Sequence, residues 1–362
     1  MALDIASYRL QNQKLSRTDL TNPVDVVHWL GAVQSQDFAG GKWAIGLRAN
    51  GLTESDVERA FTDGSILRTH VMRPTWHFVT PEDIRWMLKL TAPRVRALMA
   101  YNDRQIELDT ATIKKSYDVL TRTLQGGKQL TRAELGAALQ KSRINTDELR
   151  LTHLAMHAEL EGVICSGAKR GKQFTYALLE ERVPPTRVLE HEEAVIELAR
   201  RYFTSHGPAT AKDFSWWSGL SGADVKLGLD SIKPDFEHED VNGTTYWFVE
   251  PAKKVKNIGN RAYFLPNYDE YTVGYTDRSA IFDRSHSSKL DSRGSVLAQH
   301  VILTGGQIAA SWKRTLKTKS VAIEATLFRS LSEKEMHAMV EAAERYATFL
   351  GLPFELTFNT TE

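Results

Sequence analysis

Two glutamines separated by one residue, Gln34 and Gln36, have the side chains of this sequence best suited to chemistry. They follow an apolar stretch with helical spacing, residues 26–33, and precede a Gly40-Gly41 pair that we expect to break the chain direction. We predict that a helix ends near Gln34 and that the backbone beyond it is extended, so that side chains two positions apart point the same way. Two parallel carboxamides can hold one water molecule between them. The alternative is that both amides cap the helix end.

A second group of polar side chains lies in two predicted strands, residues 66–70 and 75–79, and in the turn between them. Its cationic or hydrogen-bonding members are Arg68, His70, Arg73 and His77. Because side chains alternate along a strand, we predict that this group projects toward the cleft of the two glutamines and contacts a lesion or a phosphate. His77, which stands between two aromatic residues, has packing in the core as its alternative.

Further basic side chains are candidates for phosphate contacts. Lys169 and Arg170 lie at the tip of a predicted hairpin, and Lys313 and Arg314 follow a tryptophan in a predicted strand. Arg278 completes the set. Phosphate contacts of this kind position a protein on a nucleic acid without reading its sequence.

The charge of the chain is balanced overall but uneven along its length. The sequence has 46 lysines and arginines against 45 acidic residues, a net charge of +1. Residues 251–320 nevertheless contain twelve basic and five acidic residues, an excess of seven positive charges. Such an excess can recruit a polyanion, although a solvated lysine-rich face gives the same pattern. We predict that the carboxylates of Asp269, Glu270 and Asp277 fold back to hold Arg278.

Several common classes of chemistry lack support in the sequence. There is no phosphate-binding loop of the Walker type, no Gly-x-Ser-x-Gly elbow and no His-Glu-x-x-His helix. The single cysteine, Cys165, excludes a disulfide framework. His153 and His157 are spaced by one helical turn, but core packing explains them better than metal ligation. We therefore expect no metal and no cofactor, and we expect a cytoplasmic monomer without a membrane span.

Three segments of about 80 residues share one order of predicted elements. The clearest is residues 106–185, where Thr131 and Glu134 form a capping box at the start of one helix and a second helix follows at about 147–160. A hairpin with a basic tip, residues 163–178, completes a winged helix. Residues 186–258 repeat the order, and Asn242-Gly243 marks a two-residue hairpin turn.

Residues 1–105 fit a third winged helix, which carries the two glutamines. Its predicted elements are the helix ending at Gln34, a helix at 54–61 and strands at 66–70 and 75–79. The last segment, residues 259–362, differs, with strands at 262–265, 301–303 and 307–312 and a final helix from Ser332. We thus predict an α+β fold of tandem winged helices that form a concave DNA clamp, followed by a C-terminal α+β domain.

A family resemblance rests on six short motifs taken together. They are Gln34-Ser35-Gln36, Leu67-Arg68-Thr69, Met72-Arg73-Pro74-Thr75-Trp76-His77, Leu265-Pro266 with Tyr268-Asp269-Glu270, Gly274-Tyr275-Thr276-Asp277-Arg278, and Gly306-Gln307 with Ser311-Trp312-Lys313-Arg314. With these motifs in this order over most of its length, the chain resembles the AlkZ-type winged-helix DNA glycosylases. Two positions depart from that family: Ser35 stands where a hydrophobic residue is usual, and Pro74 where glycine is common.

The resemblance implies a bacterial enzyme that excises alkylated purines from double-stranded DNA and, in some members, unhooks interstrand crosslinks. The paired glutamines of the family carry over onto Gln34 and Gln36. An N7-alkylated guanine already carries a positive charge, so it leaves as a neutral base without a general acid, and two amides that position a water molecule suffice. Asp37 is the first carboxylate to suspect of catalysis, but its place directly after Gln36 puts it on the opposite face of an extended segment.

Two other classes of function remain open at this point. The same winged helices could serve a non-catalytic DNA-binding regulator, in which the glutamines only cap a helix, or a scaffold for other proteins. Base release separates an enzyme from a regulator, and salt-dependent duplex binding separates both from a scaffold. We also expect no strand-cleaving lyase activity, because no Schiff-base lysine or N-terminal proline is apparent.

Overall fold

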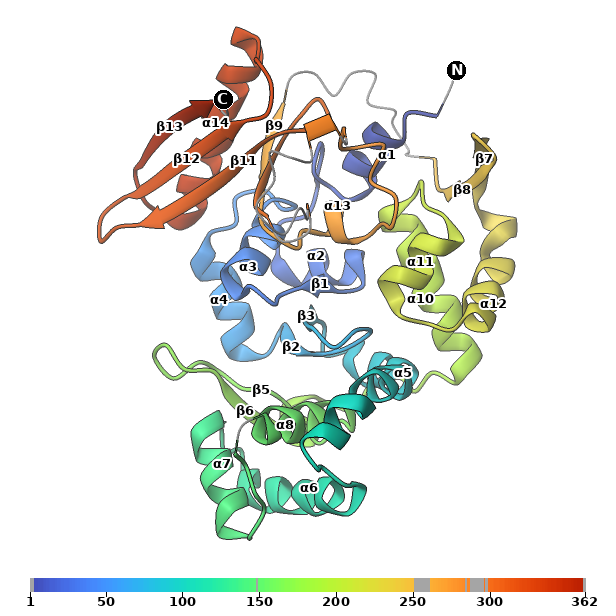
Figure 1. The fold of residues 1–362 in the computed structure, drawn as a ribbon, viewed down its shortest axis with the longest axis vertical. Helices are drawn as coiled ribbons and strands as arrows, with labels where there is room; N and C mark the ends of the chain where they lie inside the picture. Colours follow the sequence, from blue (N-terminus) through green and yellow to red (C-terminus); the bar gives the residue numbers. More distant parts are fainter. Residues whose placement is uncertain are drawn as a thin grey trace.

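The described part of the chain folds into four sheets and the helices that pack on them, and the C-terminal sheet stands at one end of the long axis (Figure 1). The computed structural model describes residues 3–360 except 148, 251–260, 284, 287–295 and 297–298. Almost all strand pairs in this part of the chain are antiparallel. This mixture of helices with largely antiparallel sheets agrees with the predicted α+β class.

The N-terminal segment supplies the first sheet, in the order β1-β3-β2. Its elements are α1 (Ile5–Asn12), α2 (Pro23–Leu30), β1 (Val33–Gln34), α3 (Phe38–Gly46), α4 (Glu54–Asp63), β2 (Leu67–His70), β3 (Trp76–Val79) and α5 (Ile84–Gln105). The predicted helix at 54–61 and both predicted strands are present. Gly40-Gly41 lies inside α3, so the expected break there was wrong. Gly41 allows close packing instead, because a Cβ atom on it would lie 3.1 Å from the Cα atom of Ser35.

Residues 106–185 contain the two predicted helices and the predicted hairpin, and a further helix, α6, precedes them. The elements are α6 (Thr110–Leu124), β4 (Leu130–Thr131), α7 (Arg132–Lys141), α8 (Arg150–Leu160), β5 (Ile164–Ser166), β6 (Thr175–Leu178) and α9 (Leu179–Arg182). The capping box of Thr131 and Glu134 forms at the start of α7, as predicted. The short β4 pairs with β6, which gives a three-stranded sheet in the order β4-β6-β5.

The next segment packs three helices against a two-stranded hairpin. It contains α10 (His191–His206), α11 (Ala211–Ser218), α12 (Gly222–Ile232), the 3₁₀ helix η1 (Lys233–Asp235), β7 (Glu237–Val241) and β8 (Thr244–Phe248). Asn242 and Gly243 have φ angles of 51° and 75°. Positive φ at both central residues is the signature of the predicted two-residue hairpin turn.

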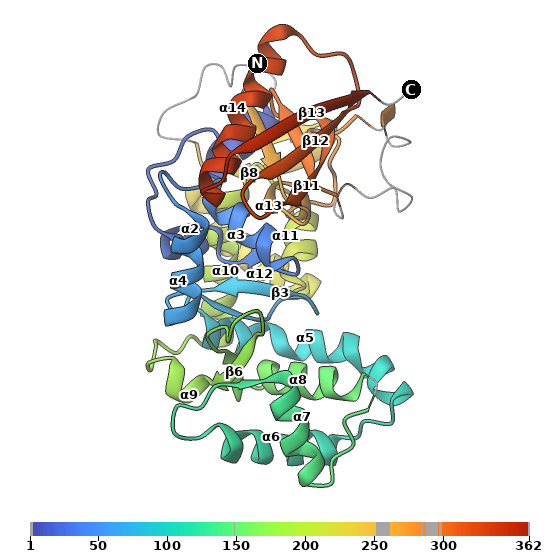
Figure 2. The same cartoon turned by 90° about the vertical axis from the view of Figure 1, so that its left-hand side faces the viewer.

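The C-terminal segment forms a five-stranded sheet in the order β13-β12-β11-β10-β9. Its elements are β9 (Ala262–Leu265), α13 (Glu270–Val273), β10 (Val301–Thr304), β11 (Gln307–Leu316), β12 (Val321–Leu327), α14 (Glu333–Leu350) and β13 (Phe354–Thr360). The sequence reading missed β12 and β13. These two strands are parallel, and α14 provides the crossover that a parallel pair requires. Figure 2 shows α14 beside β12 and β13.

Three hydrophobic clusters hold these segments together. One joins the N-terminal helices to the C-terminal sheet: Trp43 of α3 lies 4.9 Å from the ring of Tyr346 and donates a hydrogen bond to the carbonyl of Phe264. A second joins β2, β3 and α5 to α10–α12, and a third lies within residues 108–178. The glutamine segment therefore lies between packed layers. Among the described helices, none combines the length and apolarity needed to cross a bilayer.

Candidate active site

The glutamine segment is an edge strand rather than a helix end. Helix α2 stops at Leu30, where Gly31 adopts a φ of 80° and donates back to the carbonyl of His28. The predicted helix end at Gln34 was thus four residues too late, because the left-handed glycine ends the helix first. β1 follows, with Gln34 paired to His77 across β3, and the N–H of Ser35 extends the ladder to the carbonyl of Trp76 at 2.8 Å. The hydrogen bonds of both glutamine side chains go elsewhere, so they do not cap the helix.

The carboxamide of Gln34 is fixed by an arginine. Nη2 of Arg73 lies 3.2 Å from Oε1 of Gln34, and Nη1 lies 3.4 Å from the carbonyl of Trp216. A guanidinium can only donate hydrogen bonds, so it turns the carbonyl oxygen of Gln34 toward itself and the amide nitrogen away. Gln34 is 8% exposed. Its side chain is therefore held in one orientation at the edge of a largely buried site.

Gln36 occupies the more open position. The side chain is exposed, and its Oε1 accepts a hydrogen bond of 3.3 Å from the backbone N–H of Trp76. Each glutamine thus uses one lone pair of its carbonyl oxygen within the protein and keeps a second lone pair and two N–H donors. These remaining groups can bind a water molecule in a defined orientation.

Glu270 anchors the backbone of this site, which the sequence reading did not predict. Its carboxylate is fully buried; Oε1 accepts from the N–H of Gln34 at 3.0 Å, and Oε2 accepts from Nε1 of Trp217 at 2.9 Å. Nε2 of His206 lies 3.3 Å from Oε2. Burial would raise the pKa of the Glu270 carboxyl, but hydrogen bonds from His206 and Gln34 and the charge of Arg73 outweigh it and lower the pKa to about 2.

The prediction that three carboxylates hold Arg278 was wrong for the two buried ones, Asp269 and Glu270. Arg278 donates to the carbonyls of Thr272 and Thr276. Asp269 forms a buried ion pair with Arg48 at 2.8 Å, and Glu270 faces Gln34. The sequence places these carboxylates close to Arg278 along the chain, but it does not show which arginine each of them meets in the fold.

His77 lies opposite Gln34 and is completely buried. Its Nδ1 is 2.9 Å from the carbonyl of Thr75, and its Nε2 has no hydrogen-bond partner in the described part of the chain. Burial, helped by the charge of Arg73, lowers the pKa of His77 to about 3. The imidazole is therefore neutral at physiological pH, with Nδ1 as donor and Nε2 as an unpaired acceptor.

Arg68 and His70 lie on the other face of the same sheet. The register pairs Arg68 with Phe78 and His70 with Trp76, whereas Gln34 and His77 are paired on the opposite face. This corrects the expectation that all four side chains of the strand pair project into one cleft, because alternation along a strand divides them. Arg68 donates to the carbonyl of Ser35, and His70 is hydrogen-bonded to the buried Glu159.

Most of the remaining predicted contact residues have partners within the protein. Lys169 pairs with Glu58 at 2.9 Å and Arg170 with Glu134 at 2.8 Å. Arg314 lies 3.6 Å from Asp37. Lys313 is exposed on β11. Six basic residues of the positively charged segment 251–320 lie outside the described residues, namely Lys253, Lys254, Lys256, Arg284, Lys289 and Arg293.

Asp37 and the histidine pair His153 and His157, the other candidates for catalysis or metal binding, have structural roles. Asp37 caps α3 by accepting from the N–H groups of Ala39 and Gly40. His153 and His157 both face Asp103, at 2.6 and 3.0 Å, in line with the predicted packing role. No cluster of three or more histidine, cysteine or acidic side chains suited to a metal ion occurs among the residues described.

Comparisons with known proteins all match this chain to the same family. A family model described as DNA glycosylase AlkZ-like matches residues 27–349. The interstrand DNA cross-link repair glycosylase of Streptomyces sahachiroi is 25% identical over 328 residues, covering 85% of this chain and 86% of that protein. The solved structure of the Streptomyces sahachiroi DNA glycosylase AlkZ matches with a TM-score of 0.80 and 22% identity over 98% of both chains. The structural match shows a shared fold.

Proposed function

The chain belongs to the AlkZ-like family of DNA glycosylases, and from this premise we propose that it releases cationic N7-alkylated purines from double-stranded DNA, with Gln34 and Gln36 as the catalytic residues. The observation that carries the proposal is the fixed carboxamide of Gln34, which Arg73 orients from the side chain and Glu270 anchors from the backbone. Gln36 lies two residues further along the chain, at a bend between β1 and α3. The two amides thus form a prepared site for one water molecule.

The chemistry needs no carboxylate. Hydrolysis of an ordinary glycosidic bond uses two carboxyl groups, one as acid and one as nucleophile or base. A purine alkylated at N7 is already cationic and leaves as a neutral base, and the oxocarbenium-like sugar then captures a positioned water molecule. The second lone pair on each carbonyl oxygen of Gln34 and Gln36 is available to stabilise the developing positive charge. Neutral, undamaged purines are poor substrates under this mechanism.

The neighbouring carboxylates support a mechanism by amides. Asp37 is engaged as the cap of α3 and lies beside Arg314. Glu270 is fully buried behind the backbone of Gln34, where it cannot touch a DNA substrate. The product is an abasic site, and we propose no lyase step.

Duplex binding by tandem winged helices is part of the proposal. The element order in residues 106–185, three helices followed by a hairpin with β4 as third strand, supports a winged helix there. Helices followed by a hairpin in residues 186–258, and the helix and strand order in residues 1–105, support two more, with 259–362 as the C-terminal domain. We propose that these units form a concave clamp around DNA.

Crosslink unhooking extends the proposal to a second substrate. The relative from Streptomyces sahachiroi is named for interstrand cross-link repair, and it aligns with most of this chain. An N7–N7 crosslink presents two cationic purines, so the same water-positioning amides serve both lesions. We also propose that the protein acts as a monomer on the chromosome in the cytoplasm.

Incubation with a duplex that carries a single N7-methylguanine tests the proposal. We expect alkali-labile abasic sites from the native protein and a large loss of them from Gln34→Ala and Gln36→Ala, with duplex affinity retained. Tight binding without base release from this duplex or from a crosslinked one would favour a non-catalytic regulator. Release of undamaged purines at a comparable rate would contradict the mechanism.

A further inference from the structure

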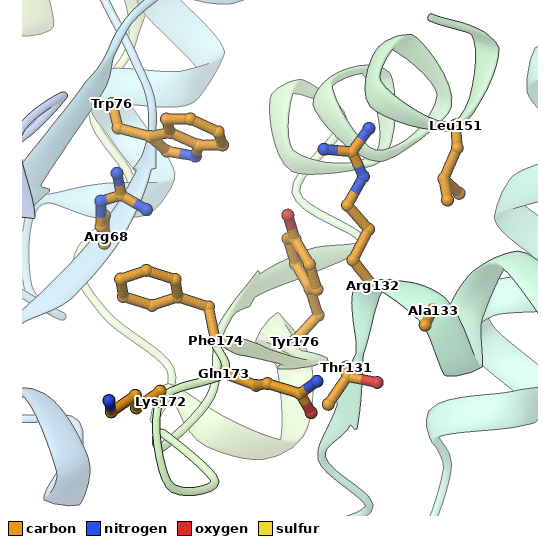
Figure 3. Close-up of a pocket in the computed structure, with 10 residues that line it drawn as sticks. All are labelled: Arg68, Trp76, Thr131, Arg132, Ala133, Leu151, Lys172, Gln173, Phe174 and Tyr176. Carbon is orange, nitrogen blue, oxygen red and sulfur yellow. The ribbon is translucent and has the colours of Figure 1, made fainter. Parts of the chain in front are cut away.

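A cavity of about 530 Å³ opens between the first sheet and the winged-helix unit of residues 106–185 (Figure 3). Its walls come from β2, β3, β6, α7 and α8. The lining consists mainly of aromatic and cationic side chains: Arg68, Trp76, Arg132, Lys172, Phe174 and Tyr176. This volume lies within the range of pockets that hold small organic ligands.

Arg68 ties this cavity to the glutamine segment. Its Nε and Nη2 donate to the carbonyl of Ser35 at 3.2 and 2.9 Å, and its guanidinium lies 4.3 Å from the ring centre of Trp76 and 4.9 Å from that of Phe174. No described carboxylate contacts this buried cation, and none of the described residues accepts from its Nη1. The cation is thus fixed between two aromatic rings, and the N–H donors of Nη1 are unused.

Tyr176 contributes a second free polar group. Its ring forms part of the wall, and in Figure 3 its hydroxyl lies between Arg68 and Arg132. Within the described chain, that hydroxyl makes no hydrogen bond. Lys172 and Arg132, both exposed, stand at the rim. The cavity therefore combines flat apolar faces with unused donors inside and positive charge outside.

We propose that this cavity binds one nucleobase that is unstacked from the duplex, a base other than the one that is cleaved. Aromatic side chains stack any base, the free donors of Arg68 and Tyr176 can bond to a base edge, and the rim cations match the phosphates of its strand. This inference rests on the proposed function, because it takes damaged duplex DNA as the substrate.

The geometry indicates why the occupant differs from the cleaved base. Trp76 and Arg68 lie on one face of the first sheet, and Gln34 and His77 lie on the other. A sugar held at Gln34 therefore faces away from the cavity. Both sites nevertheless meet at residues 35–36, since Arg68 bonds to Ser35 and the N–H of Trp76 bonds to Gln36. A base in the cavity comes from the partner strand or from a flanking nucleotide.

Photocrosslinking tests this assignment without relying on base release. The Gln34→Ala protein is bound to N7-methylguanine duplexes that carry 5-iodouracil opposite the lesion or at either flanking position, and the crosslinked peptides are mapped by mass spectrometry. We expect one of these positions to crosslink to Trp76, Phe174 or Tyr176. Crosslinks that map only elsewhere overturn the proposal, whatever the native protein does in the excision assay.

A pair of matched variants checks that the cavity itself is responsible. Ala133→Trp fills it from an exposed position on α7, and Ala137→Trp places the same side chain one turn further along, outside the lining. We expect the crosslink yield to fall at least about fivefold with Ala133→Trp, as loss of one base–aromatic stack implies, and to persist with Ala137→Trp. Trp76→Leu provides a second test if Ala133→Trp folds poorly. An equal yield in the cavity variant and its control contradicts the proposal.

Discussion

The two faces of the sheet β1-β3-β2 carry similar residue types, but the hydrogen bonding of their buried polar groups differs. On one face, Gln34, Arg73 and Glu270 satisfy one another, and the carboxamide has one orientation. On the other face, Arg68 is buried among aromatic rings, and part of its hydrogen-bonding capacity is unused. The difference fits our proposals that the first face carries the catalytic amides and that the second binds a ligand, because buried donors that remain free are available to a ligand.

The strongest test of the prepared face is removal of its buried carboxylate. Glu270→Ala leaves the N–H of Gln34, Nε1 of Trp217 and His206 without an acceptor in a fully buried site. We expect a loss of about 3–5 kcal/mol in the free energy of unfolding, the range for removing one partner of a buried charged network. Urea denaturation measures it.

Glu270→Gln is the control for this loss. The substitution keeps the shape and one acceptor oxygen but removes the charge, so we expect a smaller loss, about 1–3 kcal/mol. Equal losses for the two variants would show that packing of the side chain, and not its hydrogen bonds, holds the segment.

The next largest effect concerns Arg73, which the sequence reading assigned to lesion or phosphate contact. The structure gives it the alternative role of orienting the amide of Gln34. With Arg73→Ala we expect the single-turnover rate of base release to fall about 100-fold, since a displaced catalytic group commonly costs that much. The salt dependence of duplex binding separates the two roles: it stays unchanged for an orienting residue, whereas a lost phosphate contact reduces the slope by about one.

His77 predicts a pH dependence of stability. Its pKa is about 3 in the folded protein against 6.5 for a free histidine, so only the unfolded chain binds this proton between those values. The contribution of His77 to stability is therefore complete above pH 6.5 and declines as the pH falls toward 3. We expect a slope of about 1.4 kcal/mol per pH unit from this residue near pH 5.

His77→Phe isolates that contribution from the other buried histidines. The substitution nearly preserves the ring volume, and Nε2 has no partner to lose in the described structure. Urea denaturation between pH 4 and 7 should show a shallower pH dependence for the variant. Identical slopes in both proteins would mean that His77 takes up a proton in the folded state.

The sequence predicted local elements well and long-range partners poorly. The capping box at Thr131 and the Asn242-Gly243 turn were found because their signals lie within four residues. The early helix end at Gly31 was missed because apolar spacing continues past it. Strand β13 was missed because a parallel pairing with β12 is set by the crossover helix, not by the strand itself.

The same limit applies to the candidate site. Gln34 and Gln36 were recognisable from their spacing and from the family resemblance. The partners that orient Gln34 are 39 residues away for Arg73 and 236 residues away for Glu270. No periodicity connects such positions. Side chains alternate between the two faces of a sheet, so Arg68 and His77 could be assigned to opposite faces once the register of β2 and β3 was known.

We expect the smallest effects on DNA binding from two lysines outside the glutamine site, one with an ion-pair partner and one without. Lys313 is exposed and has no ion-pair partner in the described chain, whereas Lys169 pairs with Glu58. The Lys169–Glu58 pair is half-buried and still open to solvent, so DNA phosphate can replace Glu58 as the partner of Lys169. We expect Lys169→Ala and Lys313→Ala each to reduce the salt slope of duplex binding by about one and to leave the rate of bound-state base release unchanged.

Glu58→Gln sharpens this last prediction. If Lys169 must leave Glu58 to reach a phosphate, removing the carboxylate charge frees the lysine and strengthens duplex binding at low salt. Fluorescence anisotropy over a salt series measures both variants and the native protein on the same duplex. An unchanged affinity in Glu58→Gln together with an unchanged slope in Lys169→Ala assigns this lysine to the protein alone, and leaves Lys313 as the better candidate for backbone contact.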